Sequence, residues 1–171
     1  LFAVINGLKA IVKASIDVEK SLTDINVILG ADAKGLGQFS RELFTIARQT
    51  SQSFDIVSKA ALEFSRQGLG ITETLKRTRD ALILTRLSGM KVEESVKALT
   101  AGVNSFNKEM LDSTQIVNKM ATVDANFAVS TKDLSEAISR VGSAAQDAGV
   151  KFDDLLGMVT LLQQTTSRGG A

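Results

Sequence analysis

The stretch AVSTKDLSEAISRVGSAAQDAGVKFDDLLGMVTLL, residues 128–162, predicts a helix, a tight turn and a second helix. Ser130 or Thr131 can cap the first helix, because a short side-chain oxygen there accepts a hydrogen bond from an otherwise unpaired backbone N–H. Apolar residues then recur at helical spacing and form one face: Leu134, Ala137, Ile138, Val141, Ala144, Ala145 and Ala148. Gly149 follows this face, and a glycine there can adopt the left-handed conformation that ends a helix.

The second helix of this stretch begins directly after the glycine. Its apolar face consists of Phe152, Leu155, Leu156, Val159 and Leu162. Two aspartates in its first turn place negative charge at the positive end of the helix dipole, which stabilises the helix. This unit of two helices predicts a packed helical protein and does not by itself indicate a function.

The same spacing extends over the whole chain and predicts an all-α protein of about eight amphipathic helices with no sheet. The other six apolar faces span residues 1–29, 36–46, 54–64, 75–87, 92–106 and 116–127. We expect Ser51 or Ser53 to cap the third helix, Thr72 the fourth, and Asp112 or Ser113 the sixth. The chain contains no proline, so glycines mark the helix ends instead.

The fourth helix is expected to bury one stripe of large apolar side chains. This stripe consists of Leu75, Leu82, Ile83 and Leu87.

Short joints separate the expected helices, and Gly70, Gly89 and Gly149 are the structural joint residues that we single out. The joint sequences GITETL, GMKVEES, KEMLDS, AVSTKDL and GVKFDDL begin at residues 70, 89, 108, 128 and 149. GMKVEES and GVKFDDL are alike at nearly every position. Because short joints favour antiparallel neighbours, this repeat predicts a helical array or bundle. We expect Gly89 and Gly149 to have positive φ.

We divide the chain into three parts. Residues 1–30 form a long amphipathic helix whose two heptad-like seams favour either intramolecular packing or self-association. Residues 31–37 form a glycine-rich joint, and residues 38–171 form the remaining helical region. The first residue is not Met and the last residues form no obvious tail, so we expect the sequence to be an excerpt of a longer chain.

Composition excludes several classes of function. Twenty basic and nineteen acidic residues give a net charge of +1. The overall charge of the chain therefore does not attract nucleic acid or anionic lipid. The chain lacks both histidine and cysteine, which excludes a zinc site, a thiol nucleophile and a histidine-based triad. We expect no cofactor. No apolar run reaches the roughly twenty residues of a membrane-spanning helix, so membrane contact is not supported.

Paired carboxylates are the first candidate for chemistry. Glu93 with Glu94, and Asp153 with Asp154, each lie in the first turn of an expected helix. Adjacent residues on a helix point about 100° apart, and stabilisation of the helix dipole explains these pairs without catalysis.

Two further patterns also have simpler structural interpretations. Gly35-Leu-Gly37 and Gly68-Leu-Gly70 lack the third glycine and the preceding strand of a dinucleotide loop. The densest basic run is interrupted by an aspartate, and no Trp or Tyr is present for base stacking. We therefore interpret this run as a solvated helix face; it consists of Lys76, Arg77, Arg79 and Arg86.

Several helices in order resemble the core region of phage tail tape measure proteins, of the type found in long-tailed phages and prophage-derived tails. The matching segments are FDIVSKAALEFSRQGLGITETLKRTRDALILTRLSGM, ALTAGVNSFNKEMLDSTQIVNKM, ANFAVSTKDLSEAISRVGSAAQDAGVKFDDLLGMVTLLQQ and TSRGGA. The resemblance covers roughly residues 40 to 171. It lies in the order and character of the helices rather than in one signature motif.

The resemblance implies a structural component of a phage tail rather than an enzyme. Such a protein would sit inside the tail tube, template its assembly and length, and leave ahead of the DNA. Implied partners are tail tube proteins, tail tip or baseplate hub proteins and tail assembly chaperones, with a homo-oligomer guessed to be a trimer. The implied location is the tail lumen of the virion, and the host cytoplasm during assembly.

Two other classes stay open. A helical adaptor or repeat scaffold that binds partner helices would show the same periodicity. A carboxylate enzyme would need two acidic residues from different helices to converge in a pocket. No sequence-specific binding of nucleic acid is expected.

Overall fold

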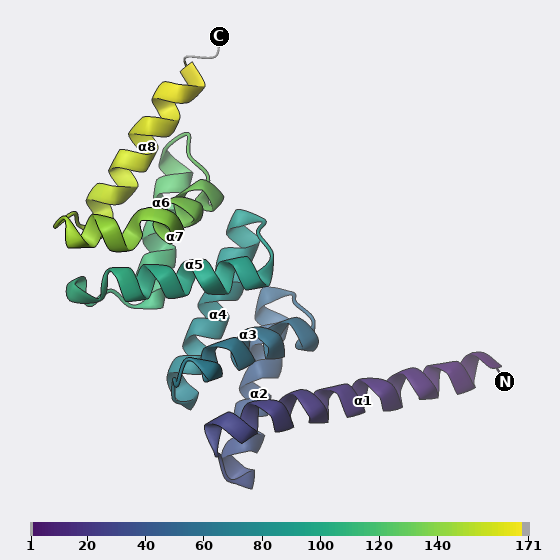
Figure 1. The fold of residues 1–171 in the computed structure, drawn as a ribbon. Helices are drawn as coiled ribbons and strands as arrows, with labels where there is room; N and C mark the ends of the chain where they lie inside the picture. The colour runs from purple at the N-terminus through teal and green to yellow at the C-terminus, as the bar shows by residue number, and fades with distance from the viewer. Residues whose placement is uncertain (1, 169–171) are drawn as a thin grey trace. The chain divides into compact units, whose positions relative to one another are not determined.

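The computed structural model describes the backbone of residues 2–168 and the side chains of residues 15–166. Within this range the chain forms eight α-helices and one 3-10 helix, with no strand. They are α1 (Phe2–Leu29), α2 (Ala33–Thr50), α3 (Phe54–Arg66), α4 (Ile71–Ser88), α5 (Val92–Ser105), η1 (Asn107–Glu109), α6 (Ser113–Asn126), α7 (Thr131–Asp147) and α8 (Phe152–Arg168), as Figure 1 shows. The predicted all-α class is confirmed.

The chain divides into two compact units, Leu1–Thr78 and Arg79–Ala171, and the division falls within α4. In the first unit α1 packs along α3, and α2 packs against α3. Phe44 of α2 stacks on Phe54 at the start of α3, with ring centroids 4.3 Å apart. The side chains of this core are almost completely buried: Ile25, Phe39, Leu43, Ile46, Val57, Ala60, Ala61 and Phe64.

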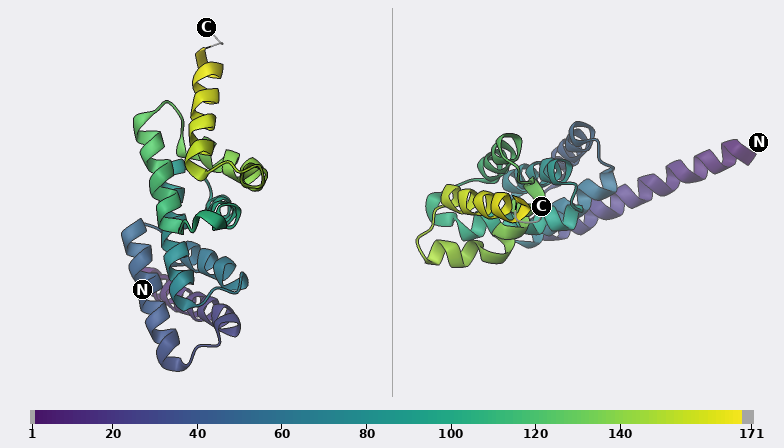
Figure 2. Two further views of the ribbon diagram at one scale, coloured as in Figure 1. Left: turned by 90° about the vertical axis from the view of Figure 1, so that its left-hand side faces the viewer. Right: turned by 90° about the horizontal axis from the view of Figure 1, so that it is seen from above.

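In the second unit, α5 and α7 lie side by side, and α6 and α8 run across them (Figures 1 and 2). Phe106, which ends α5, meets Phe152 of α8 edge to face, with ring centroids 5.0 Å apart. Such an aromatic pair contributes about 0.5–1.5 kcal/mol beyond the burial of its area. The other large buried side chains are Leu82, Leu84, Leu99, Ile116, Met120, Leu134, Ile138, Leu155 and Leu156.

Two glycines allow the helices of the second unit to approach closely. A Cβ atom at Gly142 of α7 would lie 3.1 Å from the Ser105 Oγ atom. A Cβ atom at Gly102 of α5 would lie 3.3 Å from the Ile116 Cγ2 atom. Both distances are shorter than ordinary van der Waals contacts, so a larger residue would push the helices apart.

The expectation that consecutive helices pack antiparallel is wrong. Within each unit, consecutive helices turn across one another, as Figure 1 shows, and the most extensive packing joins helices two places apart in the chain. These pairs are α1 with α3 and α5 with α7. The joints are short, but their backbone conformation directs the chain sideways instead of back along the preceding helix.

Most of the expected caps are present. The Ser53 hydroxyl accepts from the N–H of Ile56, the Asp112 carboxylate from Gln115, and the Ser130 hydroxyl from Asp133. Thr72 is not a cap, because α4 already begins at Ile71.

The start of α2 also differs from the prediction. Helix α2 begins at Ala33, so Gly35 and Gly37 lie inside a helix and not in a joint. The Asp32 carboxylate accepts a hydrogen bond of 2.7 Å from the Gly35 N–H and starts the helix early.

The buried stripe of α4 is rotated relative to the prediction. Ile83 and Leu87 are 38% and 46% exposed, whereas Ala81, Leu82 and Leu84 are fully buried. Neighbouring helices, rather than hydrophobicity alone, therefore select which apolar residues of α4 are covered.

Only the second of the two heptad-like seams of α1 lies among the side chains that the structure describes. The seam from Leu1 to Val12 lies outside the side chains that the structure describes. In the second seam Ile25 is fully buried and Val18, Leu22 and Leu29 are half-buried. Because α1 packs along α3, this second seam follows the intramolecular alternative.

Candidate functional site

The three glycines predicted as joint residues lie between helices. Gly70 directly precedes α4, Gly89 follows α4, and Gly149 lies between α7 and α8. The φ angles of +68° at Gly89 and +80° at Gly149 confirm the predicted positive values. In the joint before α4, the positive φ of +78° belongs to Gly68. These angles direct each following helix, and larger residues adopt them only with strain.

A buried carboxylate on α4 holds the start of α6. Asp80 is 4% exposed, and it accepts hydrogen bonds of 2.6 Å from the Ser113 hydroxyl and 2.9 Å from the Thr114 hydroxyl. The negative charge also faces the first turn of α6, where the helix dipole is positive. Hydrogen bonds to a charged group contribute about 1.5–3 kcal/mol each, so Asp80 is a strong link between the two helices.

Two further carboxylates hold helix starts in the same way. The Asp124 carboxylate of α6 accepts from both the backbone N–H (2.8 Å) and the hydroxyl (2.5 Å) of Thr131, the first residue of α7. The Glu109 carboxylate of η1 accepts a 2.7 Å bond from the N–H of Phe152, the first residue of α8. Sequence reasoning missed these three roles.

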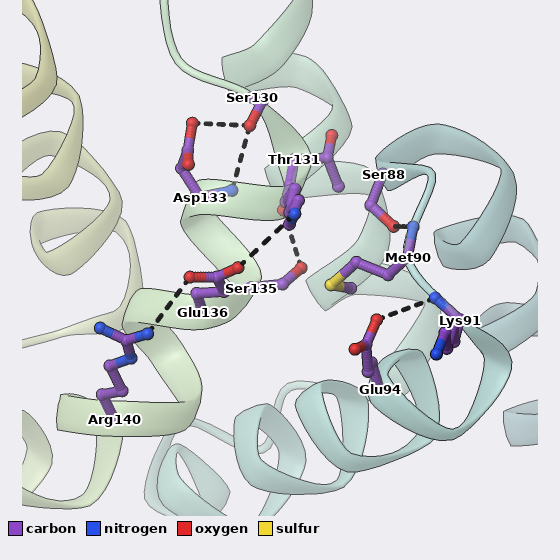
Figure 3. A network of polar contacts seen from close by, with 11 residues as sticks. Ser88, Met90, Lys91, Glu94, Ser130, Thr131, Asp133, Ser135, Glu136 and Arg140 are labelled. Carbon is purple, nitrogen blue, oxygen red and sulfur yellow. Dashed lines mark hydrogen bonds and ion pairs between the residues drawn. The ribbon is translucent and has the colours of Figure 1, made fainter.

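Local caps complete the joints, as Figure 3 shows. The Lys91 N–H donates a 2.9 Å hydrogen bond to the Glu94 carboxylate at the start of α5. At the start of α7, the Ser130 hydroxyl donates a 2.6 Å bond to the Asp133 carboxylate. Side-chain hydrogen bonds therefore define both joints, together with Gly89 in the joint before α5.

The paired carboxylates occupy the first turns of α5 and α8, where we predicted them. Glu94 caps its own helix, and Asp153 forms a 2.7 Å ion pair with Lys119 of α6. Among the described residues, no group of three or more acidic side chains is arranged to hold a metal ion.

The arginines of the basic run on α4 differ in exposure to solvent. Arg77 is largely buried and forms a 2.7 Å ion pair with Glu73. Arg79 and Arg86 are exposed.

An open apolar groove lies between α6 and α8. Its volume is about 610 Å³, and the Lys119–Asp153 ion pair belongs to its lining. Phe127 and Leu161 line it and are 53% and 63% exposed. The remaining lining residues are Asn118, Thr122, Val123, Leu156, Gly157, Thr160 and Gln164. Such a surface can receive apolar side chains, and its lining offers neither histidine nor cysteine as a nucleophile or base.

A family model described as "phage-related minor tail protein" matches residues 30–171. The chain belongs to this family. It is also similar to the tape measure protein of Pneumococcus phage Dp-1, with 19% identity over 160 residues. That alignment covers 94% of this chain and 14% of the phage protein, and no solved structure matches. The resemblance to tape measure proteins is thereby confirmed.

Membership of this family supports a structural role in a phage tail. In this minor tail protein, the joints set the path of the chain, and the groove beside α8 is an exposed apolar surface. Of the helices that the structure describes, none has the length and apolar character needed to cross a bilayer.

Proposed function

We propose that this chain is a region of a tape measure protein that occupies the lumen of the tail tube. In this role it helps to template tube assembly and length, and it leaves the tube ahead of the DNA. The observation that carries the proposal is the similarity to a phage tape measure protein along 94% of this chain. The family match over residues 30–171 favours this role over that of a general helical adaptor.

The proposed partners follow from that role. They are tail tube proteins, tail tip or baseplate hub proteins, and tail assembly chaperones in the host cytoplasm. We also propose self-association as a trimer, because a chain inside a tube with rotational symmetry is expected to share that symmetry. Native mass spectrometry of the longer chain checks this, and a monomer would contradict it.

We further propose that this region contributes to the tail as a folded module and not as an extended ruler, and the folded structure supports this. Each unit has a core of its own, and α5 and α7 pack side by side within one of them. A single straight helix would rise about 1.5 Å per residue, whereas crossing helices add much less to any one axis.

Deleting Lys91–Ser130 from the full-length protein tests the proposal. The deletion removes α5, η1 and α6, and α7 then loses the helix along which it packs. We expect tail misassembly. An extended ruler would instead yield intact tails shortened by roughly 60 Å, since these forty residues would rise about 1.5 Å each.

Electron microscopy of the tails distinguishes the outcomes. A matched control is Lys97→Ala, which changes an exposed residue of α5 and should leave the tails normal. Intact tails shortened by the full amount would contradict the folded module. Intact tails of unchanged length would contradict a role of this region in assembly.

A further inference from the structure

The apolar face of helix α8 continues beyond its buried part, because Leu162 lies two turns after Leu155 on the same side of the helix. Leu155 and Leu156 are buried in the second unit. Three other side chains of the same helix are half exposed or more, and we call them the α8 apolar surface: Met158 (51%), Leu161 (63%) and Leu162 (63%). Part of the apolar face of α8 is therefore left exposed by the described residues.

The internal repeat indicates which part of the fold covers this surface. Helices α5 and α8 follow the similar joint sequences GMKVEES (89–95) and GVKFDDL (149–155), so their positions correspond at a constant offset of sixty. Met158 corresponds to Ala98, and Leu162 corresponds to Gly102. Ala98 is 5% exposed and Gly102 is buried. These two positions are therefore buried on α5, whereas the corresponding positions on α8 are exposed.

The next two helices of the chain provide that cover for α5. A Cβ atom at Gly102 would lie 3.3 Å from the Ile116 Cγ2 atom of α6 and 3.6 Å from the Ile138 Cγ2 atom of α7. The corresponding residue of α8 is Leu162, whose larger side chain suits a partner helix at a greater axial distance.

We propose that the α8 apolar surface is covered, in the full-length protein, by helices of the same chain that follow residue 171. They would cover α8 as α6 and α7 cover α5. The length of the related tape measure protein supports this occupant, because the matched region is only 14% of that protein. The inference concerns the fold of the longer chain and does not depend on a position in the tail tube.

Cysteine reactivity in the full-length protein tests whether the surface is covered. The 171 residues contain no cysteine, so a single cysteine introduced here can be followed in its own peptide by mass spectrometry. We expect Leu162→Cys to react with a maleimide at least about tenfold more slowly than Lys97→Cys, an exposed control on α5. Both should react equally fast in urea. Equal rates in the native protein would overturn the proposal.

Crosslinking from a second variant identifies the occupant. A photoreactive crosslinker is attached to the cysteine of Met158→Cys in a mixture of isotopically light and heavy full-length protein. The isotope labels distinguish crosslinks within one copy from crosslinks between two copies. Crosslinks within one copy to peptides beyond residue 171 support the proposal. Crosslinks only to another copy, only to a different tail protein, or only to residues 1–171 overturn it, and so does the absence of any crosslink beyond residue 171.

Discussion

Replacing Gly142 of α7 by alanine should destabilise the second unit, although alanine is the better helix former. Alanine gains roughly 1 kcal/mol over glycine inside a helix. The added Cβ, however, would lie 3.1 Å from the Ser105 Oγ atom, 3.2 Å from the Ser105 Cβ atom and 3.5 Å from the Phe106 Cε2 atom. Phe106 is fully buried against Phe152 and has no room to move. Overpacking of this kind costs about 1–3 kcal/mol, so we expect a net loss of roughly 1 kcal/mol.

Gly157→Ala is the matched control, because it makes the same change in α8 with no atom within 4 Å of the new Cβ. It should raise the free energy of unfolding by about 0.5–1 kcal/mol. Gly102→Ala, for which sequence alone suggests a gain if space permits, should gain little because Ile116 lies 3.3 Å from the new Cβ.

Urea denaturation followed by circular dichroism measures all three changes. We expect the urea midpoints of Gly142→Ala and Gly157→Ala to move in opposite directions; with a slope of about 1–3 kcal/mol per molar urea, a change of 1 kcal/mol corresponds to roughly 0.3–1 M. If Gly142→Ala is at least as stable as the parent protein, this result would contradict the close approach of α7 to the end of α5.

Other substitutions test the joints and the links between helices, each by the same denaturation experiment. Gly149→Val should destabilise by about 1 kcal/mol or more, because a β-branched residue is strained at a φ of +80°; an unchanged midpoint would contradict that conformation. Asp80→Ala should cost about 2 kcal/mol, since it leaves the buried Ser113 hydroxyl without its acceptor; a loss no larger than that of an exposed Asp→Ala change would argue against the link. Glu109→Ala should cost about 1 kcal/mol by removing the acceptor of the Phe152 N–H, and full stability would show that another group caps α8.

The periodicity of apolar residues was enough to predict the helices of this protein. Helix formation depends on neighbouring residues along the chain, so the spacing of leucines, the absence of proline and the caps at Ser53 and Asp112 determine most boundaries. The positive φ at Gly149 could be predicted for the same reason, because the end of a helix is a local event. The error at α2 was also local, since Asp32 starts the helix before the glycines.

The arrangement of these helices depends on contacts between residues far apart in the sequence. Whether α5 packs along α6 or along α7 is decided by which surfaces fit, and the close approach at Gly142 is visible only when Ser105 lies opposite it. The pairing of Asp80 with Ser113 joins residues 33 positions apart, and no periodicity encodes it. Sequence by itself determined that this protein is helical and which residues end its helices, because those interactions lie within one or two turns. Only the tertiary structure decided which apolar residues are covered, because burial depends on the shape of the neighbouring helices.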